Sequence, residues 1–264
     1  MFKIFLVILF LILFFFFIYP IILLIYIALP GLEGALLTKS FLESFGLTVL
    51  ISSAASLVAV VLGVPTAYIL TRYNFPLKQI VDALMDIPIV IPHTVVGIMV
   101  ILAFADYGLG PYLNSLGLKI IDAIPGAIIA VSYLSATYAL RSIQSALRLL
   151  DPELENVART LGASPLRSFL YVVLPNISGA IADGALLSWA RSVSESGALL
   201  VVAYYVILGT RSIYPASIYI YQSYIGVGLA DAVKFSAALV LIVISIFLAY
   251  RALLGHVRAK GAKG

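Results

Sequence analysis

Six long apolar runs constrain this chain more than any other feature, because each is long enough for a helix to cross a bilayer, which takes about 20 residues. The balance of residues excludes a water-soluble domain: 63% are hydrophobic and only 11% are charged, where a soluble domain has about a quarter. Too few polar residues remain to cover a water-facing surface, so the solvent of this chain is lipid. The predicted spans are Ile4–Leu29, Phe45–Leu70, Met85–Ala105, Ile120–Leu140, Ile177–Tyr205 and Ala232–Leu254.

These runs predict an all-α integral membrane protein, a single membrane domain over residues 1–264 with six transmembrane helices. The first run, residues 4–29, has the position of a signal peptide. Its apolar core is far longer than the roughly 7–15 residues of one, however, and no small-x-small cleavage site follows. We therefore expect a retained membrane anchor and a multi-pass chain surrounded by the lipid of the plasma membrane.

Lysines and arginines are distributed unevenly between the two sides of these spans. With the N-terminus inside, eleven of the 16 fall on the cytoplasmic side and four outside, and Arg191 lies within a span. This bias predicts that both termini are cytoplasmic, which requires an even number of spans. The net charge of +4 thus reflects membrane topology and not binding to nucleic acid. The cytoplasmic set is Lys3, Arg72, Lys78, Arg141, Arg148, Arg159, Arg167, Arg251, Arg258, Lys260 and Lys263, and the outer set is Lys39, Lys119, Arg211 and Lys234.

An amphipathic, charge-bearing segment, residues 151–175, lies between the fourth and fifth predicted spans. Asp151-Pro152 is typical of a helix start, since aspartate accepts a hydrogen bond from a free N–H and proline suits the first helical position. Gly162 is expected to stop this helix, because glycine readily takes a positive φ. Ser164-Pro165 begins a second helix by the same chemistry, and Leu174-Pro175 is expected to end it. The product is two short cytoplasmic helices joined at a glycine, with an exposed apolar stripe.

That stripe has two interpretations on the residues alone. An amphipathic helix can dock in the groove of a partner protein. It can also lie on lipid headgroups at the membrane surface. The pattern by itself leaves both open.

Charged and helix-breaking residues inside the spans mark a second region of interest. Arg191 and Glu195 lie one turn apart in the fifth predicted span, and an ionised side chain at mid-bilayer costs roughly 2.5–3.5 kcal/mol. Both should therefore face the interior of the helix bundle, as residues of a translocation path or gate or as a structural ion pair. In the third span, Pro88 and Pro92 each remove a backbone donor, which indicates a pathway or a simple kink. His93 follows directly and is either a packing residue or part of the same path.

Motifs that are missing exclude several classes of protein. The sequence has no G-x-x-x-x-G-K-[ST] loop to hold ATP phosphates, and neither H-E-x-x-H nor G-x-S-x-G occurs. With no cysteine and two histidines, the common zinc sites are excluded. We also find no internal repeat of the kind that secondary transporters carry. A helical bundle of this kind needs an energy source made by another chain, so this chain is not expected to be an enzyme.

The sequence Ala158-Arg159-Thr160-Leu161-Gly162-Ala163-Ser164 resembles the EAA loop of type I ABC-importer permeases. The family pattern is a glycine, about nine residues, an aliphatic residue, one more residue and Leu-Pro, which Gly162, Val172 and Leu174-Pro175 fit. The usual Glu-Ala-Ala is Asn156-Val157-Ala158 here, with Glu155 displaced by one position. The coupling residues implied are Glu155, Ala158, Arg159, Gly162, Ala163, Ser164, Phe169, Leu174 and Pro175.

This resemblance implies both a mechanism and partners. Residues 151–175, the coupling segment, would dock in a groove of a cytoplasmic ABC ATPase. That ATPase would bind ATP and Mg, so no cofactor is expected on this chain. A second copy of the chain would complete a homodimer, and an extracytoplasmic substrate-binding protein would deliver the solute for alternating access.

Two further stretches resemble one branch of that family, over a core of about residues 45–250. Asp86–Ile98 is similar to the proline-rich span of molybdate, tungstate and sulfate permeases. Ser188–Tyr205 is similar to a segment that commonly reads Ala-Arg-x-x-(Gly/Ser)-Glu-Phe-Gly-Ala, with Ser196 in place of the phenylalanine. The archaeal molybdate/tungstate type is the most similar. The implied path or gate residues are Pro88, Pro92, His93, Arg191, Ser194, Glu195 and Gly197.

Other functions remain as alternatives. A permease for sulfate or another small solute would share the same fold. A secondary carrier or channel driven by ion gradients would use Arg191 and Glu195 as a charge relay and would need no ATPase. A membrane-embedded enzyme would need a catalytic cluster that the sequence does not contain.

Overall fold

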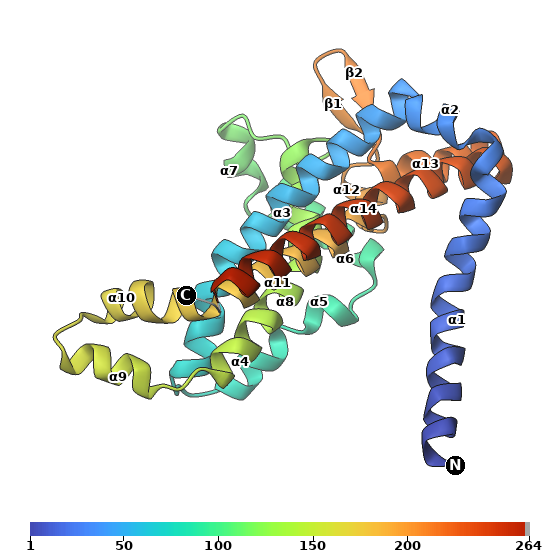
Figure 1. Cartoon of the computed structure of the whole chain (residues 1–264). Helices are drawn as coiled ribbons and strands as arrows, with labels where there is room; N and C mark the ends of the chain where they lie inside the picture. The colour runs from blue at the N-terminus through green and yellow to red at the C-terminus, as the bar shows by residue number, and fades with distance from the viewer. Residues whose placement is uncertain (262–264) are drawn as a thin grey trace.

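The computed structural model describes residues 1–261 as a mostly helical bundle (Figure 1). Among the described residues, five helical stretches are long and apolar enough to span a membrane, and a sixth span exists if a pair of helices bent by 107° crosses as one. Five of the six predicted runs thus correspond to candidate spans, and the third to the bent pair. The stretches are Phe2–Leu37, Lys39–Arg72, Ile124–Leu149, Pro165–Val193 and Leu229–Gly255, and the bent pair is Lys78–Val90 with His93–Asp106.

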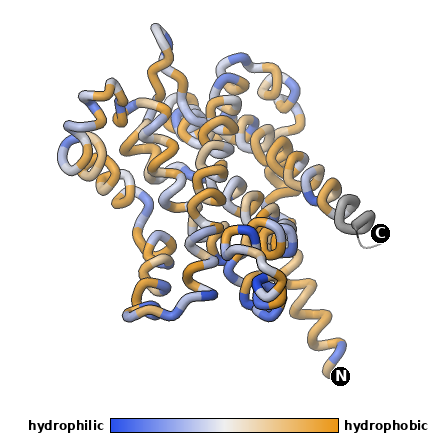
Figure 2. Tube along the Cα trace, turned by 90° about the vertical axis from the view of Figure 1, so that its left-hand side faces the viewer, coloured by the Kyte–Doolittle hydropathy of each residue, from blue (hydrophilic) through white to orange (hydrophobic). Residues whose placement is uncertain are grey.

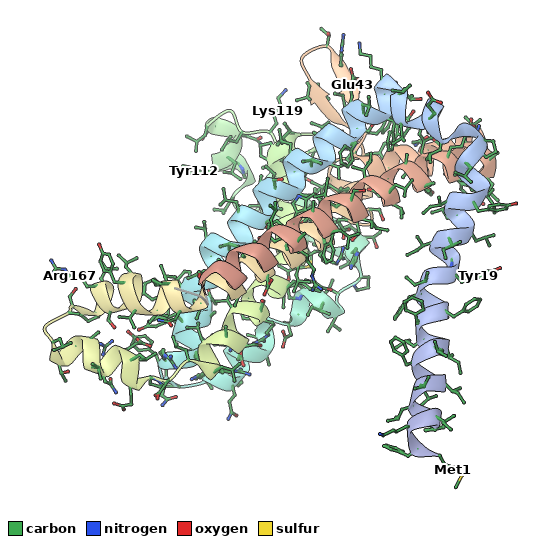
Figure 3. The ribbon with its side chains drawn as sticks, in the orientation of Figure 1. Met1, Tyr19, Glu43, Tyr112, Lys119 and Arg167 are labelled. Atoms are coloured by element: carbon green, nitrogen blue, oxygen red, sulfur yellow. The ribbon has the colours of Figure 1, made fainter. Side chains whose placement is uncertain are left out.

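The first helix, α1 (Phe2–Ala28), stands apart from the rest of the bundle (Figure 1). Its residues are apolar on every side, and almost all of their side chains are exposed in the monomer (Figures 2 and 3). A helix that is hydrophobic all round is buried in protein or in lipid. It joins the bundle through the 3₁₀ turn Leu29–Gly31 and α2 (Leu32–Leu37), which packs against the start of α14 (Leu229–Gly261).

The centre of the bundle is formed by three helices, α3 (Lys39–Arg72), α8 (Ile124–Leu149) and α11 (Leu174–Val193). Small residues allow their backbones to approach closely, as is usual between helices in membranes. A Cβ added to Gly63 would lie 3.6 Å from the backbone nitrogen of Leu140, and one on Gly184 would lie 3.1 Å from the carbonyl oxygen of Ala139. The three helices therefore form a closely packed framework.

The third predicted span, Met85–Ala105, is broken and not continuous. It consists of α4 (Lys78–Leu84), α5 (Ile87–Val90), α6 (His93–Ile101) and a π-helical turn, Leu102–Asp106. Pro88 lies in the first turn of α5, where proline is tolerated, whereas Pro92 takes an extended ψ of 133° directly before α6. Only the second proline, with the extended residue Ile91 before it, accompanies the sharp bend.

The fifth span also differs from its predicted bounds, Ile177–Tyr205. It begins earlier, with α10 (Pro165–Ser168), and continues through a π-helical turn, Phe169–Val173, into α11. The expected helix end at Leu174-Pro175 is therefore wrong, because the π-helical turn places Pro175 in the first turn of α11. The helix ends at Val193, so Glu195 lies in the loop before the short α12 (Leu199–Val202) and not inside a span.

A β-hairpin corrects the all-α expectation. The strands β1 (Val206–Leu208) and β2 (Arg211–Ile213) pair antiparallel around a turn in which Gly209 has φ of 62°. At its base, the Ile207 N–H donates to the carbonyl of Asp122 at 3.0 Å, while the Asp122 N–H donates to Val202. Burial raises the pKa of the Asp122 carboxyl, and hydrogen bonding from Tyr205 opposes that shift.

The molecule has two distinct ends (Figure 1). The hairpin and α7 (Gly110–Ser115) lie at one end, which we call the hairpin end. The helices α9 (Glu153–Thr160) and α10 project at the opposite, coupling end, toward which the free ends of α1 and α14 also point. The remaining helix is α13 (Ala216–Gly226). Of the predicted cytoplasmic cations, Lys263 lies outside the described residues, as do the side chains of Arg258 and Lys260.

Candidate coupling segment and translocation site

The first part of the coupling segment, residues 151–165, has the local structure that its sequence predicts. The Glu153 N–H donates to Asp151 Oδ1 at 3.0 Å, which caps α9. At the other end of α9, the Gly162 N–H donates to Arg159 and the Ala163 N–H to Ala158, both at 3.0 Å. This is a Schellman motif, and Gly162 supplies its left-handed residue with φ of 90°. Ser164 Oγ then accepts from the Arg167 N–H at 3.3 Å and caps α10.

The helices α9 and α10 form a pair that projects from the bundle (Figure 1), with Arg167 pointing away from it (Figure 3). The side chain of Leu161 is 84% exposed at the tip, and the apolar residues beside it are exposed as well. Leu166 also lines a groove between α10 and α3, together with Tyr68 and Ile69. The exposed apolar residues are Leu154, Val157, Leu161, Leu166 and Leu170.

Glu155 does not share this exposed face. It is buried, with 5% of its surface exposed, and its Oε1 accepts from Arg72 Nε at 2.7 Å. Its Oε2 accepts from the hydroxyl of Tyr68 at 2.6 Å, and Arg72 also donates to the carbonyl of Leu150 at 2.8 Å. Glu155 therefore fastens α9 to the ends of α3 and α8.

The other predicted coupling residues differ in their exposure. Arg159, Gly162, Ser164 and Pro175 are exposed, whereas Ala158 and Ala163 are half-buried. Phe169 and Leu174 pack against the bundle, and the Phe169 ring meets Tyr68 edge-on with 4.8 Å between centroids. Sequence reasoning missed Tyr68 as a functional residue. The charge bias placed Arg72 at the cytoplasmic end of a span, but nothing in the sequence indicated that its partner is Glu155.

The second candidate site brings His93, Arg191 and Glu195 together. Glu195 is 1% exposed, and its Oε2 lies 3.0 Å from Arg191 Nη2 and 3.1 Å from His93 Nδ1. Its Oε1 accepts from the Ala198 N–H at 2.9 Å, and Arg191 Nη2 lies 2.8 Å from His93 Nε2. The buried carboxylate thus compensates the arginine, as a charge in a membrane bundle requires.

Two breaks in the helices meet at this site, the bend before His93 and the loop after α11. A Cβ added to Gly197 would lie 2.6 Å from His93 Cβ, and one on Gly97 would lie 2.7 Å from Val201 Cβ. The two broken segments therefore pack without room for a methyl group. Ser194 borders the cluster, since Arg191 Nη1 donates to its hydroxyl at 3.4 Å, and Ser217 donates to the carbonyl of Glu195 at 2.7 Å.

Of the predicted path residues, Pro88 is the one outside this cluster. It lines a separate cavity of about 410 Å³ between α3, α5 and α8. Pro92 takes part through the backbone bend that positions His93. Within the described residues, no group of three or more metal-ligating side chains could hold a metal ion.

A long-helix membrane bundle with a projecting helix pair is the architecture of the membrane subunits of ABC transporters, and comparison with known proteins agrees. Residues 59–260 match the family described as "Binding-protein-dependent transport system inner membrane component". The chain belongs to this family, the permease subunits of ABC importers.

Among curated relatives, the chain is similar to molybdate/tungstate transport system permease proteins. It is 35% identical to that of Pyrococcus abyssi, over 90% of this chain and 93% of the relative. It is 36% identical to that of Methanocaldococcus jannaschii, over 88% of each. A sulfate transport system permease protein of Salmonella typhimurium is 38% identical over 61% of this chain and 58% of that protein.

Solved structures share the fold. A chain of a bacterial alginate ABC transporter, in complex with its periplasmic protein, matches with a TM-score of 0.70 at 16% identity, covering 94% of this chain and 92% of that one. A chain of the inward-facing MetNI methionine ABC transporter matches with a TM-score of 0.62 at 21% identity, covering 84% and 96%.

Proposed function

We propose that two copies of this chain form the membrane pathway of an ATP-driven importer for a tetrahedral oxyanion, molybdate or tungstate. The similarity to molybdate/tungstate permeases over nine-tenths of the chain carries this proposal. Sulfate is the second candidate, because sulfate permeases match over a shorter part of the chain. All three are dianions of the same shape.

The coupling segment supplies the link to the energy source. Its exposed apolar face fits a groove in a cytoplasmic ATPase, which binds the ATP and Mg. Glu155 and Arg72 fix the base of the segment on the bundle, so a displacement of α9 is passed to α3 and α8 and not lost in a flexible loop. With this segment in the cytoplasm, we propose six spans and cytoplasmic positions for both termini.

The cluster of His93, Arg191 and Glu195 is proposed as part of the translocation path or its gate. It lies where two helices are interrupted, and non-helical backbone at membrane depth is tolerated when it lines a cavity or is buried in protein. Arg191 provides positive potential for an anion, and Glu195 balances it when no anion is present. A binding protein at the hairpin end would deliver the anion, and alternating access would pass it to the cytoplasm.

Reconstitution tests the function. The chain is purified with its ATPase, placed in vesicles and supplied with the binding protein and radioactive tungstate. We expect uptake that requires ATP hydrolysis and is competed by molybdate more strongly than by sulfate. Uptake that sulfate competes best would favour the sulfate alternative. Uptake by the chain without the ATPase would instead identify a carrier or channel.

A further inference from the structure

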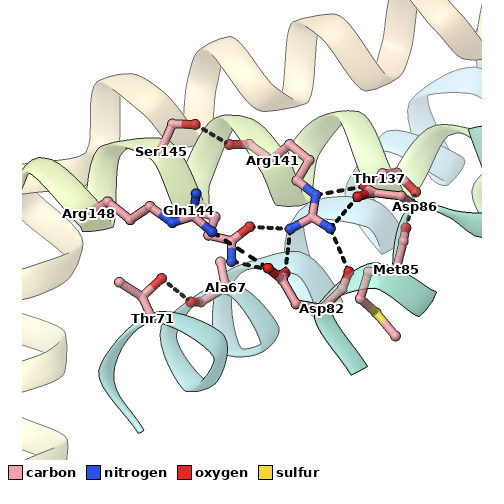
Figure 4. A network of polar contacts seen from close by, with 10 residues as sticks. All are labelled: Ala67, Thr71, Asp82, Met85, Asp86, Thr137, Arg141, Gln144, Ser145 and Arg148. Carbon is pink, nitrogen blue, oxygen red and sulfur yellow. Dashed lines mark hydrogen bonds and ion pairs between the residues drawn. The ribbon is translucent and has the colours of Figure 1, made fainter. Parts of the chain in front are cut away.

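A polar network outside both candidate sites joins α4 and α5 to α8 (Figure 4). Arg141 on α8 forms ion pairs with Asp82 and Asp86. Its Nε donates to Asp86 Oδ1 at 2.8 Å, and its Nη2 donates to the backbone carbonyl of Asp82 at 2.6 Å. Gln144, one turn further along α8, donates to Asp82 Oδ1 at 3.2 Å and accepts from Arg141. One guanidinium therefore holds both carboxylates and a carbonyl of the neighbouring segment.

Apolar packing of this attachment includes Met85, between α4 and α5, which lies partly buried against the cluster that contains Ala67 and Leu140. Neither α4 nor α5 has a single buried residue, and the cavity of about 410 Å³ lies between α5 and the framework helices. Two further polar contacts join these segments: the Thr137 hydroxyl donates to the carbonyl of Met85 at 2.9 Å, and Arg148 Nη2 on α8 lies 3.6 Å from Asp82 Oδ2. The helices α4 and α5, which we call the inner half of the broken third span, are thus held to α8 mainly by polar contacts.

These contacts are separable. The side chains of Arg141 and Asp82 are 28% and 29% exposed, and that of Asp86 is 48% exposed. Ion pairs that are partly hydrated contribute modestly to stability, because water replaces each partner when the pair opens. Opening a buried apolar contact instead exposes apolar surface to water, which costs free energy that no new contact offsets.

The network also lies between the two candidate sites. At one end, α5 leads through the bend at Pro92 to His93, which contacts Glu195. At the other end, α8 leads to Leu150, whose carbonyl is bound by Arg72, the partner of Glu155 in the coupling segment.

We propose that Arg141, Asp82 and Asp86 form an inner latch, which holds the inner half of the broken third span on α8 in one state of the transporter and opens in each cycle. The latch deepens the proposed function, since it connects the coupling segment to the bend that positions His93. Its opening allows α4 and α5 to move away from the closely packed framework of α3, α8 and α11. A contact that merely stabilises the fold would stay closed throughout the cycle.

Cross-linking tests this directly, because the chain has no cysteine of its own. The double variant Met85→Cys/Thr137→Cys places one thiol on each side of the latch, and a short bifunctional thiol reagent joins them. In vesicles containing the ATPase and the binding protein, we expect cross-linking to lower ATP-driven oxyanion uptake about tenfold and reduction of the linker to restore it. The matched control is Gly63→Cys/Leu140→Cys, which joins α3 to α8 within the framework and is expected to transport at the same rate with and without the linker.

A second measurement separates failure of the latch from failure of the proposed substrate. The rate of cross-linking of the Met85→Cys/Thr137→Cys pair is compared in the complex without nucleotide and in the complex trapped with a non-hydrolysable ATP analogue. We expect the rate to change at least fivefold between the two states, whichever solute is carried. Equal rates, or full uptake by the cross-linked pair, would overturn the latch. Absence of tungstate uptake by the untreated variant and the native chain alike would count against the proposed substrate only.

The variant Arg141→Lys is used if the cysteine pair does not assemble. Lysine keeps the charge but cannot reach both carboxylates as a planar fork. We expect a looser latch and a rise of several-fold in ATP hydrolysis without the binding protein. Native hydrolysis and native uptake in this variant would also contradict the latch.

Discussion

Gly162 is the residue at which local conformation bears most directly on function. Its φ of 90° lies in a region that L-amino acids rarely adopt, while nothing lies within 4 Å of where its Cβ would be. The strain of a substitution there is therefore conformational and not steric. It falls on the turn that sets the angle between α9 and α10.

We expect Gly162→Val to uncouple transport while the chain still inserts in the membrane. A β-branched residue at this φ costs about 1–3 kcal/mol, which the turn avoids by opening and separating α9 from α10. Gly162→Asn is the control, because asparagine tolerates a left-handed conformation. ATP-driven uptake and co-purification of the ATPase measure the effect. Normal uptake by the valine variant would show that this turn has no role in coupling.

The contacts of Glu155 could not be predicted from its position in the sequence. Its place near the family's acidic position suggests a contact with the ATPase, yet its carboxylate is used by Arg72 and Tyr68. These partners are more than 80 positions away in the sequence, so no local pattern could predict them.

At the scale of helices and loops, α6 and the segment that follows α11 pack directly against each other, because Gly97 and Gly197 allow their close approach. We expect Gly197→Ala to push His93 away from Glu195 and to reduce uptake about tenfold, since the added methyl would overlap His93 Cβ. Gly226→Ala at the end of α13 is the matched control, where the methyl meets nothing within 4 Å. Transport assays on both variants at equal membrane levels decide the point. Equal uptake would mean that this contact only packs the bundle.

The sequence predicts most of the helices but not their interruptions. The caps at Asp151 and Ser164 and the stop at Gly162 were predictable, because each depends on a few neighbouring residues. The end of α11 at Val193 was not, since the apolar residues after Gly197 continue the hydropathy of a span. The hairpin was missed because each strand has three residues, too few to show an alternating pattern.

For the whole molecule, the charge bias and the arrangement of the helix ends together predict one orientation in the membrane. The coupling segment and the free ends of α1 and α14 point toward one end of the bundle, and the hairpin lies at the other (Figure 1). Positive side chains concentrate at cytoplasmic ends, so the coupling end is expected inside. The α1 helix is apolar on every side and buries only Ala28, so it adds little to the core of the described chain (Figure 2).

Topology can be tested with three single-cysteine variants, Lys3→Cys, Ser164→Cys and Thr210→Cys, because the native chain has none. A membrane-impermeant thiol reagent is applied to intact cells and to opened membranes. We expect only Thr210→Cys, in the hairpin turn, to react in intact cells, since α11 separates it from Ser164.

Between residues 3 and 164 lie three long helices and the bent pair. If the bent pair crosses the membrane, that makes four crossings, and Lys3→Cys reacts from the same side as Ser164→Cys. If the bent pair returns to the side from which it enters, only three crossings remain and Lys3→Cys reacts from outside, so one labelling pattern decides between five spans and six.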